Sequence, residues 1–352
     1  MYEETLWISH SALSAYEKCP HLYYLEYRYK NPATGNRIQI INPYLSLGSA
    51  VHETIEGLLD FPEKERKNVS LPDRYERIFD KYRGLRGGFI SQKKEEEFYN
   101  CGVQMIQTVT ESDFLSKPSL KLNTNFPTLP LFEKKELGIK AVLVGSIDWV
   151  QLLPSKKAHI IDFKTGNSKE VNGSLQLPIY ALLAENNLTE EVEMLSYWYL
   201  QHDKQPVAKE VKNTQQHLQI IKEKTKEIWS SIEDNSFSCN FSGKCFACRD
   251  YEKIFNGEAE MISSGEERKK DVFCVFKEKD IIEKVTQEEF LDEREKKIFE
   301  LRMETTLDNI GKELRLNEEK LTTITTTIKD KLKKNLHPKE LKVVIKMLQS
   351  NS

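Results

Sequence analysis

The feature that most constrains how this chain can fold is residues 159–166, a short apolar run that ends in alternating charges. Ile160 and Ile161 are typical of a buried β-strand. Asp162 and Lys164 are two positions apart, so on a strand they project from the same face. A carboxylate and an ammonium group together at the end of a strand can hold a divalent metal ion and a water molecule beside it.

The segments on either side of this strand supply partners for it. Residues 142–150 read as a second strand that contains Asp148, and a Pro-Ser-Lys-Lys turn separates the two strands. The sequence therefore predicts a hairpin that brings Asp148 close to Asp162. Further along the chain, Gln176 and Tyr180 are four residues apart, which places both on one face of a helix.

The order of these motifs resembles the PD-(D/E)XK nucleases, in particular the RecB-like branch that includes the AddB C-terminal nuclease and Cas4. That branch builds its site from a His on an early helix, a Gly-x-x-Asp strand, an Asp-x-Lys strand end and a Gln-x-x-x-Tyr helix. The resemblance implies an α/β (α+β) fold of the restriction-endonuclease type, with a central mixed sheet flanked by helices. The matching residues are His52, Asp148, Asp162, Lys164, Gln176 and Tyr180.

The same resemblance implies a divalent-metal-dependent deoxyribonuclease, which is a hydrolase of phosphodiester bonds. Mg²⁺ prefers oxygen ligands, whereas a His ligand suits Mn²⁺ better. Lys164 would orient the attacking water, and Gln176 and Tyr180 would position DNA or Lys164. The implied metal ligands are His52, Asp148, Asp162 and the backbone carbonyl of Phe163. The implied catalytic residues are Asp148, Asp162, Lys164, Gln176 and Tyr180.

Other acidic residues compete for a place in this site. Glu53 and Glu56 are near His52 in the sequence and are lower-ranked rivals to it as ligands. The resembling family often carries a supporting Glu where the sheet begins, and Glu133 and Glu136 both fit that position loosely.

Six cysteines in a chain without a secretory signal indicate metal binding or free thiols rather than disulfides. Four thiolates suit either a structural zinc ion or an iron–sulfur cluster. The resemblance implies a [4Fe–4S] cluster that joins the two ends of the nuclease domain, with Zn²⁺ as the alternative. The third C-terminal cysteine of the family pattern would fall near Ile254, but here it lies upstream. The four predicted ligands are Cys19, Cys239, Cys245 and Cys248, with Cys274 as a less favoured substitute and Cys101 in the core.

Composition sets broad limits on the class of protein. The chain has 352 residues, of which 39% are hydrophobic and 30% charged, so we expect one large domain or two. No apolar run is long enough to span a membrane and the start does not resemble a secretory signal, so the expected location is the cytoplasm. The formal net charge of -3 means that binding to nucleic acid would depend on local basic patches.

The sequence divides into three parts. We expect a nuclease domain over residues 1–256, closed by the cysteines, a polar linker over 257–270, and a small all-α domain over 271–352. The last part resembles a sigma region 4 helix-turn-helix, through a Thr-Leu-x-x-Ile-Gly-x-Glu-Leu motif. Glu318 and Glu319 begin its recognition helix and repel phosphate, so a protein-contact module fits equally well.

The resemblance implies an exonuclease that acts on single-stranded DNA ends in DNA repair or recombination. The chain has no Gly-x-x-x-x-Gly-Lys loop, so a helicase or another repair protein would have to supply any unwinding. One alternative is a non-catalytic DNA-binding scaffold subunit of a helicase–nuclease complex. The other is a Cas4-like nuclease of CRISPR adaptation. The sequence does not predict the oligomeric state.

Overall fold

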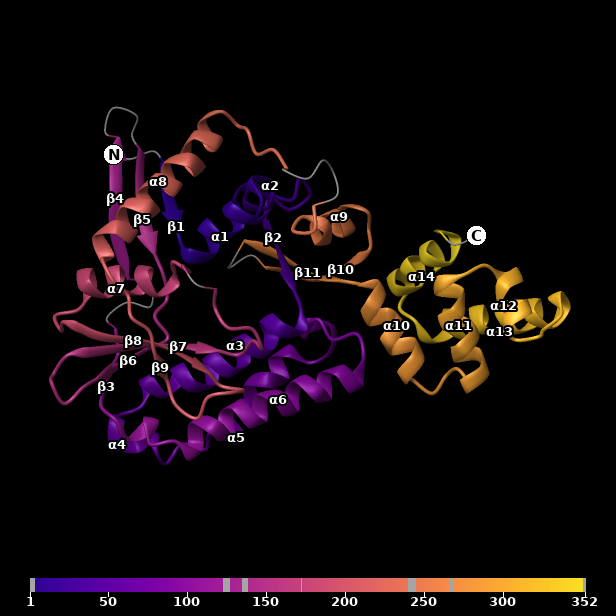
Figure 1. Ribbon diagram of the computed structural model, residues 1–352, viewed down its shortest axis with the longest axis horizontal. Helices are drawn as coiled ribbons and strands as arrows, with labels where there is room; N and C mark the ends of the chain where they lie inside the picture. The colour runs from indigo at the N-terminus through magenta and orange to yellow at the C-terminus, as the bar shows by residue number, and fades with distance from the viewer. Residues whose placement is uncertain are drawn as a thin grey trace. The chain divides into compact units, whose positions relative to one another are not determined.

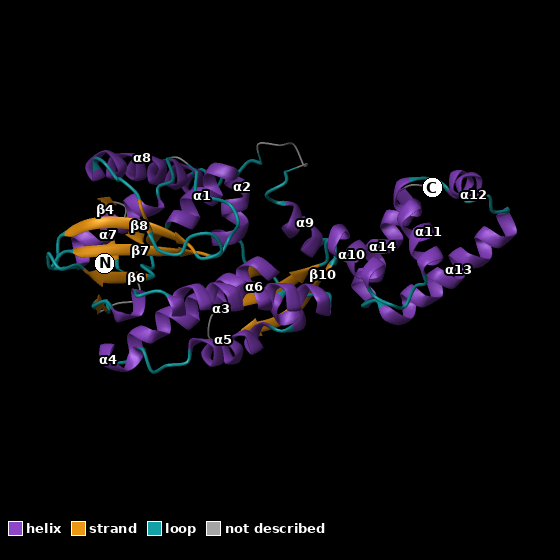
Figure 2. Ribbon diagram, turned by 60° about the horizontal axis from the view of Figure 1, so that its bottom comes forward, coloured by secondary structure: helices purple, strands orange, loops and turns teal. Residues whose placement is uncertain are grey.

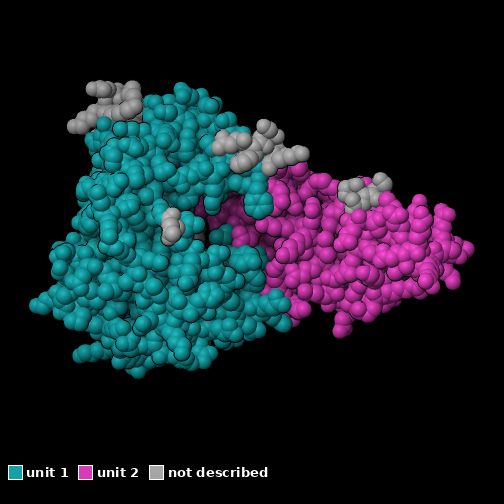
Figure 3. All heavy atoms as spheres, viewed as in Figure 1, with its two compact units in different colours: residues 1–30, 43–83, 96–248 teal, residues 31–42, 84–95, 249–352 magenta. Residues whose placement is uncertain are grey.

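A computed structural model describes residues 4–122, 127–134, 139–171, 173–239, 245–265 and 269–350. Figure 1 shows the path of the chain through its helices and strands. The chain forms two compact units, coloured separately in Figure 3. Unit 1 comprises residues 1–30, 43–83 and 96–248, and unit 2 comprises residues 31–42, 84–95 and 249–352. Each unit is therefore assembled from segments that are distant in the sequence.

The main sheet of unit 1 is mixed, with the strand order β3-β6-β7-β8-β9. The predicted hairpin is confirmed: β6 and β7 are antiparallel, and Trp149 lies opposite Ile161. β7 and β8 are parallel and are connected through helix α7, because parallel neighbours need a crossover connection. The strands are β3 (Ser119–Leu120), β6 (Trp149–Leu152), β7 (Ala158–Lys164), β8 (Val192–Tyr199) and β9 (Val207–Ala208).

The single strand predicted over residues 142–150 is wrong, because the chain breaks there into two strands that belong to different sheets. β5 ends at Val144 and β6 begins at Trp149, which leaves Asp148 in the connection. A side chain at Gly145 would place its Cβ only 2.8 Å from Leu183 of α7, so a glycine permits this close approach. The second sheet has the order β1-β5-β4, with β1 (Glu4–Ile8), β5 (Ile139–Val144) and β4 (Thr128–Lys134).

Helices lie on both sides of the main sheet, with α8 on one side and α3 and α5 on the other (Figure 2). Helix α3 carries His52 and begins at Pro43. The helices that lie in unit 1, wholly or in part, are α1 (His10–Lys18), α2 (Pro20–Tyr23), α3 (Pro43–Glu56), α4 (Glu63–Arg66), α5 (Leu71–Phe79), α6 (Gln92–Glu111), α7 (Gln176–Asn187) and α8 (Thr214–Glu233).

The two faces of β7 have different surroundings, as the period-two alternation of a strand requires. Phe163 packs into an aromatic core with Phe114, Trp149 and Trp198, at ring-centroid distances from Phe163 of 5.8, 6.4 and 6.0 Å. All four side chains are almost fully buried. Burial of rings this large contributes on the order of 4 kcal/mol each, so this core fixes the position of the strand. Asp162 and Lys164 project from the opposite face.

Unit 2 contains a three-stranded sheet with the order β10-β11-β2. The linker predicted over residues 257–270 is wrong, because β10 occupies residues 259–265 and pairs antiparallel with β11. β2 pairs with β11 in parallel. Polar and charged residues and glycine dominate the segment 257–270 as a whole, which is typical of a linker. The strands are β2 (Arg37–Ile41), β10 (Ala259–Gly265) and β11 (Lys270–Val275).

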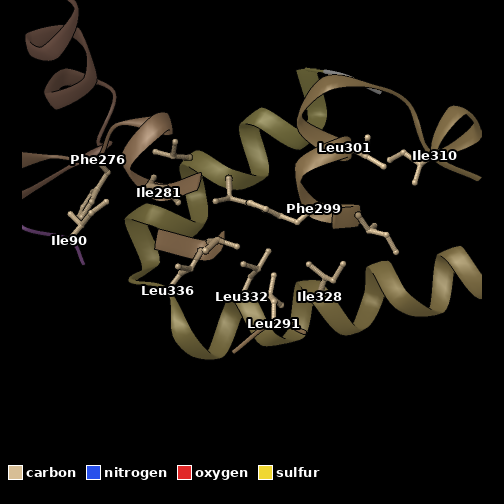
Figure 4. Close-up of a cluster of buried hydrophobic side chains, with 14 of the residues drawn as sticks. Ile90, Phe276, Ile281, Leu291, Phe299, Leu301, Ile310, Ile328, Leu332 and Leu336 are labelled. Atoms are coloured by element: carbon tan, nitrogen blue, oxygen red, sulfur yellow. The ribbon is translucent and has the colours of Figure 1, made fainter. Parts of the chain in front are cut away.

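The rest of unit 2 is helical and packs around its own apolar cluster (Figure 4). The domain predicted as all-α over residues 271–352 is not entirely helical, because most of strand β11 lies within it. Phe299 and Leu301 of α11 and Ile328 and Leu332 of α13 are members of this cluster. A capping box at Asp292 starts α11, and a four-residue turn with Arg315 at φ 54° joins α12 to α13. The helices are α9 (Arg249–Phe255), α10 (Glu278–Gln287), α11 (Glu293–Glu304), α12 (Leu307–Glu313), α13 (Glu318–Asn335) and α14 (Pro338–Ser350).

Candidate active site and cysteine centre

The end of β7 presents Asp162 and Lys164 side by side, as the strand period predicts. Lys164 Nζ lies 3.0 Å from Asp162 Oδ2 and 3.1 Å from Glu170 Oε1. Burial by itself would lower the pKa of Lys164, but Asp162 and Glu170 together raise it above its ordinary value. The ammonium group is therefore held in its charged form between two carboxylates.

Helix α7 begins at Gln176 and brings the next two predicted residues to this pair. Gln176 Nε2 donates to Asp162 Oδ1 over 2.8 Å, and Lys164 Nζ donates to Gln176 Oε1. Gln176 Nε2 also lies 3.2 Å from the hydroxyl of Tyr180, which confirms that both residues lie on one helix face. The Gln176 amide thus donates through Nε2 to Asp162 and accepts through Oε1 from Lys164, which fixes the spacing of these two side chains.

A second group of residues meets on the other side of β7. His52 of α3 places Nε2 3.1 Å from the carbonyl oxygen of Phe163 and Nδ1 2.8 Å from Glu56 Oε1. Asp148 Oδ2 lies 3.5 Å from His52 Nδ1 and accepts the backbone N–H of Phe163 over 2.9 Å. The backbone of Phe163 therefore connects this group to Asp162 and Lys164.

The charge balance of this group is set by burial and by the close carboxylates. Both partners of the His52 ring, a carboxylate and a carbonyl, are acceptors, so the ring satisfies both only as an imidazolium. Burial lowers the pKa of His52, but Asp148 and Glu56 outweigh burial and raise it to about 9. Burial raises the pKa of Asp148 to about 8, with Asp162 adding to the shift and His52 opposing it. The site thus stabilises positive charge next to buried carboxylates.

These residues fit a divalent cation. His52, Glu56 and Asp148 each offer one ligand atom, and these atoms lie within 4.8 Å of one another. Asp162 is 2% exposed, and its Oδ2 lies 3.0 Å from the Lys164 ammonium group. The donor atoms available are carboxylate and carbonyl oxygens and one imidazole nitrogen, which suits Mg²⁺ or Mn²⁺.

Four cysteines converge at a separate place in unit 1. The Sγ atoms of Cys19, Cys239, Cys245 and Cys248 all lie within 4.8 Å of one another. Cys19 stands between α1 and α2, and its Sγ is 3.7 Å from that of Cys248, 229 residues away. The remaining cysteines, Cys101 and Cys274, are not members of this group.

The thiols of this centre perturb one another. Burial raises the pKa of Cys248, and the neighbouring thiols of Cys245 and Cys19 raise it further. Burial also acts to raise the pKa of Cys19, but the backbone N–H groups of Leu22 and His21 and the neighbouring thiols lower it below its ordinary value. These contacts favour the thiolate of Cys19, which is the form that binds metals.

Comparison with known proteins places this geometry in a family. A model of the PD-(D/E)XK nuclease superfamily matches residues 7–251. The chain belongs to this superfamily. Every predicted site residue falls within the matched region, whereas α10 to α14 fall outside it. A search of curated proteins finds no match to the chain. No helix among the described residues is long and apolar enough to cross a membrane.

Sequence reasoning ranked Glu56 of this PD-(D/E)XK site below His52 and did not identify Glu170. Glu56 touches His52, and its position four residues further along the same helix was the available signal. Glu170 touches Lys164 from the loop after β7, where no periodicity could indicate it. Of the two supporting acids expected at the start of the sheet, Glu133 lies on β4 opposite Lys140. Glu136 lies outside the described residues.

Proposed function

We propose that this protein is a divalent-metal-dependent DNA nuclease of the RecB/Cas4-like type, which degrades single-stranded DNA from its ends in DNA repair or recombination. The observation that carries the proposal is the pairing of Asp162 with Lys164 at a buried strand end. Asp162 is 2% exposed, and Lys164 is held charged with its Nζ 3.0 Å from Asp162 Oδ2. Asp162 and Lys164 correspond to the acidic residue and the lysine in the name of the superfamily.

The metal ligands would come from both sides of β7. Asp162 and the Phe163 carbonyl lie on consecutive residues, and Asp148 and His52 approach the Phe163 backbone from the connection before β6 and from α3. A bound divalent ion lowers the pKa of a water molecule and neutralises charge on the scissile phosphate. Binding of the ion would displace the proton that His52 carries between its two acceptors.

Lys164 has two tasks in this proposal. Its ammonium group would hold the attacking water by hydrogen bonding, and it would stabilise the charge that develops on the phosphate oxygens. Both tasks need a fixed position, which Glu170 and Gln176 provide from two directions. Tyr180 would act through Gln176, by hydrogen bonding to the amide that touches Asp162.

We further propose that the four cysteines hold a [4Fe–4S] cluster that joins the N-terminal helices to the end of unit 1. Zinc is a second candidate, which the distance between two of the sulfurs also fits. A tetrahedral zinc ion with Zn–S bonds of about 2.3 Å places its sulfurs about 3.8 Å apart. The Cys19–Cys248 separation of 3.7 Å matches that value. Iron, acid-labile sulfide and zinc analysis of anaerobically purified protein separates the two.

The C-terminal helices would provide a contact surface beyond the nuclease domain. α12 and α13 are joined by a short turn, as in a helix-turn-helix, but α13 starts with Glu318 and Glu319. Acidic side chains at this position disfavour DNA phosphate. We therefore propose that this part contacts a protein partner, such as a helicase or another repair protein.

The test of exonuclease action compares linear with circular single-stranded DNA in the presence of Mg²⁺ or Mn²⁺. We expect degradation of the linear substrate only, and labels at each end give the polarity. Cleavage of the circle at the same rate would show an endonuclease. No cleavage by a folded protein that carries its cysteine centre would favour the scaffold alternative. A Cas4-like role in CRISPR adaptation would instead give trimming of short overhangs, without processive degradation.

A further inference from the structure

A small pocket of about 220 Å³ lies next to the catalytic end of β7. Thr165 and Gly166, the residues that follow Lys164, form one of its walls. Leu47 forms another wall from helix α3, five residues before His52, which corresponds to about 7.5 Å along the helix axis. Because Thr165 directly follows Lys164, the pocket adjoins the end of β7 that carries the site.

The side chains around the pocket are aromatic and amide groups. Tyr44 and Phe98 flank it, with ring centroids 5.0 Å apart and planes at 80°. The side chain of Tyr44 is 69% exposed, so much of its ring surface is open to a ligand. Asn167 supplies an amide group that can donate and accept hydrogen bonds, and Gln201, whose Nε2 donates to Cys101 Sγ, offers its Oε1 as an acceptor.

The charge of the pocket argues against a phosphate as its ligand. Within the described parts of the chain, no lysine or arginine lines it, and Glu97 contributes a carboxylate. A carboxylate repels phosphate oxygens. A planar group that can stack on Tyr44 and form hydrogen bonds at its edges fits this lining instead.

From this position and chemistry, we propose that the pocket binds an unpaired nucleobase of the nucleotide next to the scissile phosphate, with Tyr44 as its stacking surface. Every base has a π-face, so stacking on a tyrosine tolerates any sequence. The amides of Asn167 and Gln201 would hydrogen-bond to the base edge. The base must leave a duplex to enter, so the pocket selects single-stranded DNA.

This inference rests on the proposed nuclease function and specifies how the same site chooses its substrate. It assigns roles to side chains that the family's catalytic motifs do not contain. Tyr44 and Gln201 take no part in holding the metal ion or Lys164. Their substitution should therefore weaken substrate binding while leaving metal binding intact.

The experiment uses the full chain with Asp162→Asn, which should bind DNA without cutting it. Binding of labelled single-stranded oligonucleotides is measured by fluorescence anisotropy, with one abasic site moved through successive positions. We expect one position at which loss of the base weakens binding about tenfold, as removal of one stacked base does. Tyr44→Ala should weaken binding of the intact strand similarly and abolish the abasic effect, whereas Tyr44→Phe should retain both.

Trp7→Ala is the matched control, because Trp7 is another exposed aromatic residue of unit 1 (54% exposed) and lies on β1, away from the pocket. Equal binding at every abasic position, or Tyr44→Ala binding like Trp7→Ala, would overturn the base pocket. Metal-dependent cleavage by the parent chain would then still support the nuclease. If the parent chain neither binds nor cleaves DNA, both proposals fail.

Discussion

Removal of Cys19 should destabilise unit 1 far more than the loss of one small side chain would. A centre held by Cys19 and Cys248 closes a loop of 229 residues. The chain-entropy relation for a cross-link gives a stabilisation of about 5 kcal/mol for a loop of this length. Cys19→Ala should therefore lower the free energy of unfolding by several kcal/mol.

Intrinsic tryptophan fluorescence during urea unfolding is the suitable assay. All four tryptophans, Trp7, Trp149, Trp198 and Trp229, lie in unit 1, so the signal reports on that unit alone. With a urea dependence of about 2.5 kcal/mol per M, the midpoint should fall by about 2 M. Cys101→Ala is the control, since Cys101 is a free thiol of unit 1 outside the centre.

The reasoning would be refuted by a specific result. If Cys19→Ala unfolds at the same urea concentration as Cys101→Ala, while the wild type is shown to carry its metal centre, the centre does not close this loop. Treatment of the wild type with a chelator that removes the metal should reproduce the Cys19→Ala midpoint, which checks the conclusion without a mutation.

Three further predictions follow from particular contacts. Gln176→Leu removes hydrogen bonds to Asp162 and Lys164. This substitution should lower kcat about 10- to 100-fold, with KM for DNA little changed. An unchanged kcat would contradict the positioning role of Gln176. Mg²⁺ affinity, measured by calorimetry, should rise with pH up to about pH 9, because the ion must displace protons from His52 and Asp148. The pKa values of these two residues are raised to about 9 and about 8. An affinity that does not change with pH would exclude His52 and Asp148 as ligands. Asp271→Asn should destabilise unit 2 by about 2–4 kcal/mol in hydrogen exchange, because the buried carboxylate accepts hydrogen bonds from Asn31, Thr34, Asn36 and Ser264. Those bonds lower the pKa of Asp271 to about 2, so the same stability should be lost in the wild type as pH falls from about 4 towards 2, and a pH-independent unit 2 would contradict this.

Local sequence patterns were sufficient for the centre of the fold. The apolar run before Asp162 makes a strand that is buried on both faces, so it had few alternatives. The four-residue spacing of Gln176 and Tyr180 specified a helix face directly. Both predictions use periodicity within one element, which does not depend on the rest of the chain.

Features that depend on distant partners could not be predicted in this way. β10 is a strand because β11 offers it a backbone edge, not because its own residues favour one. The chain leaves β5 after Val144, where Gly145 lies against Leu183 of α7, and no local pattern indicates that distant contact. Glu170 reaches Lys164 from an irregular loop, and only the tertiary fold determines that contact.

The most direct test of the central claim is the rate of metal-dependent cleavage of end-labelled single-stranded DNA by the wild type and by Asp162→Asn. Asp60→Asn serves as the matched control, because Asp60 is an exposed acid of the same unit that pairs with Lys121. We predict that the wild type and Asp60→Asn cleave DNA only with Mg²⁺ or Mn²⁺, and that Asp162→Asn is folded and inactive. Cleavage by Asp162→Asn at the wild-type rate would contradict the proposed site.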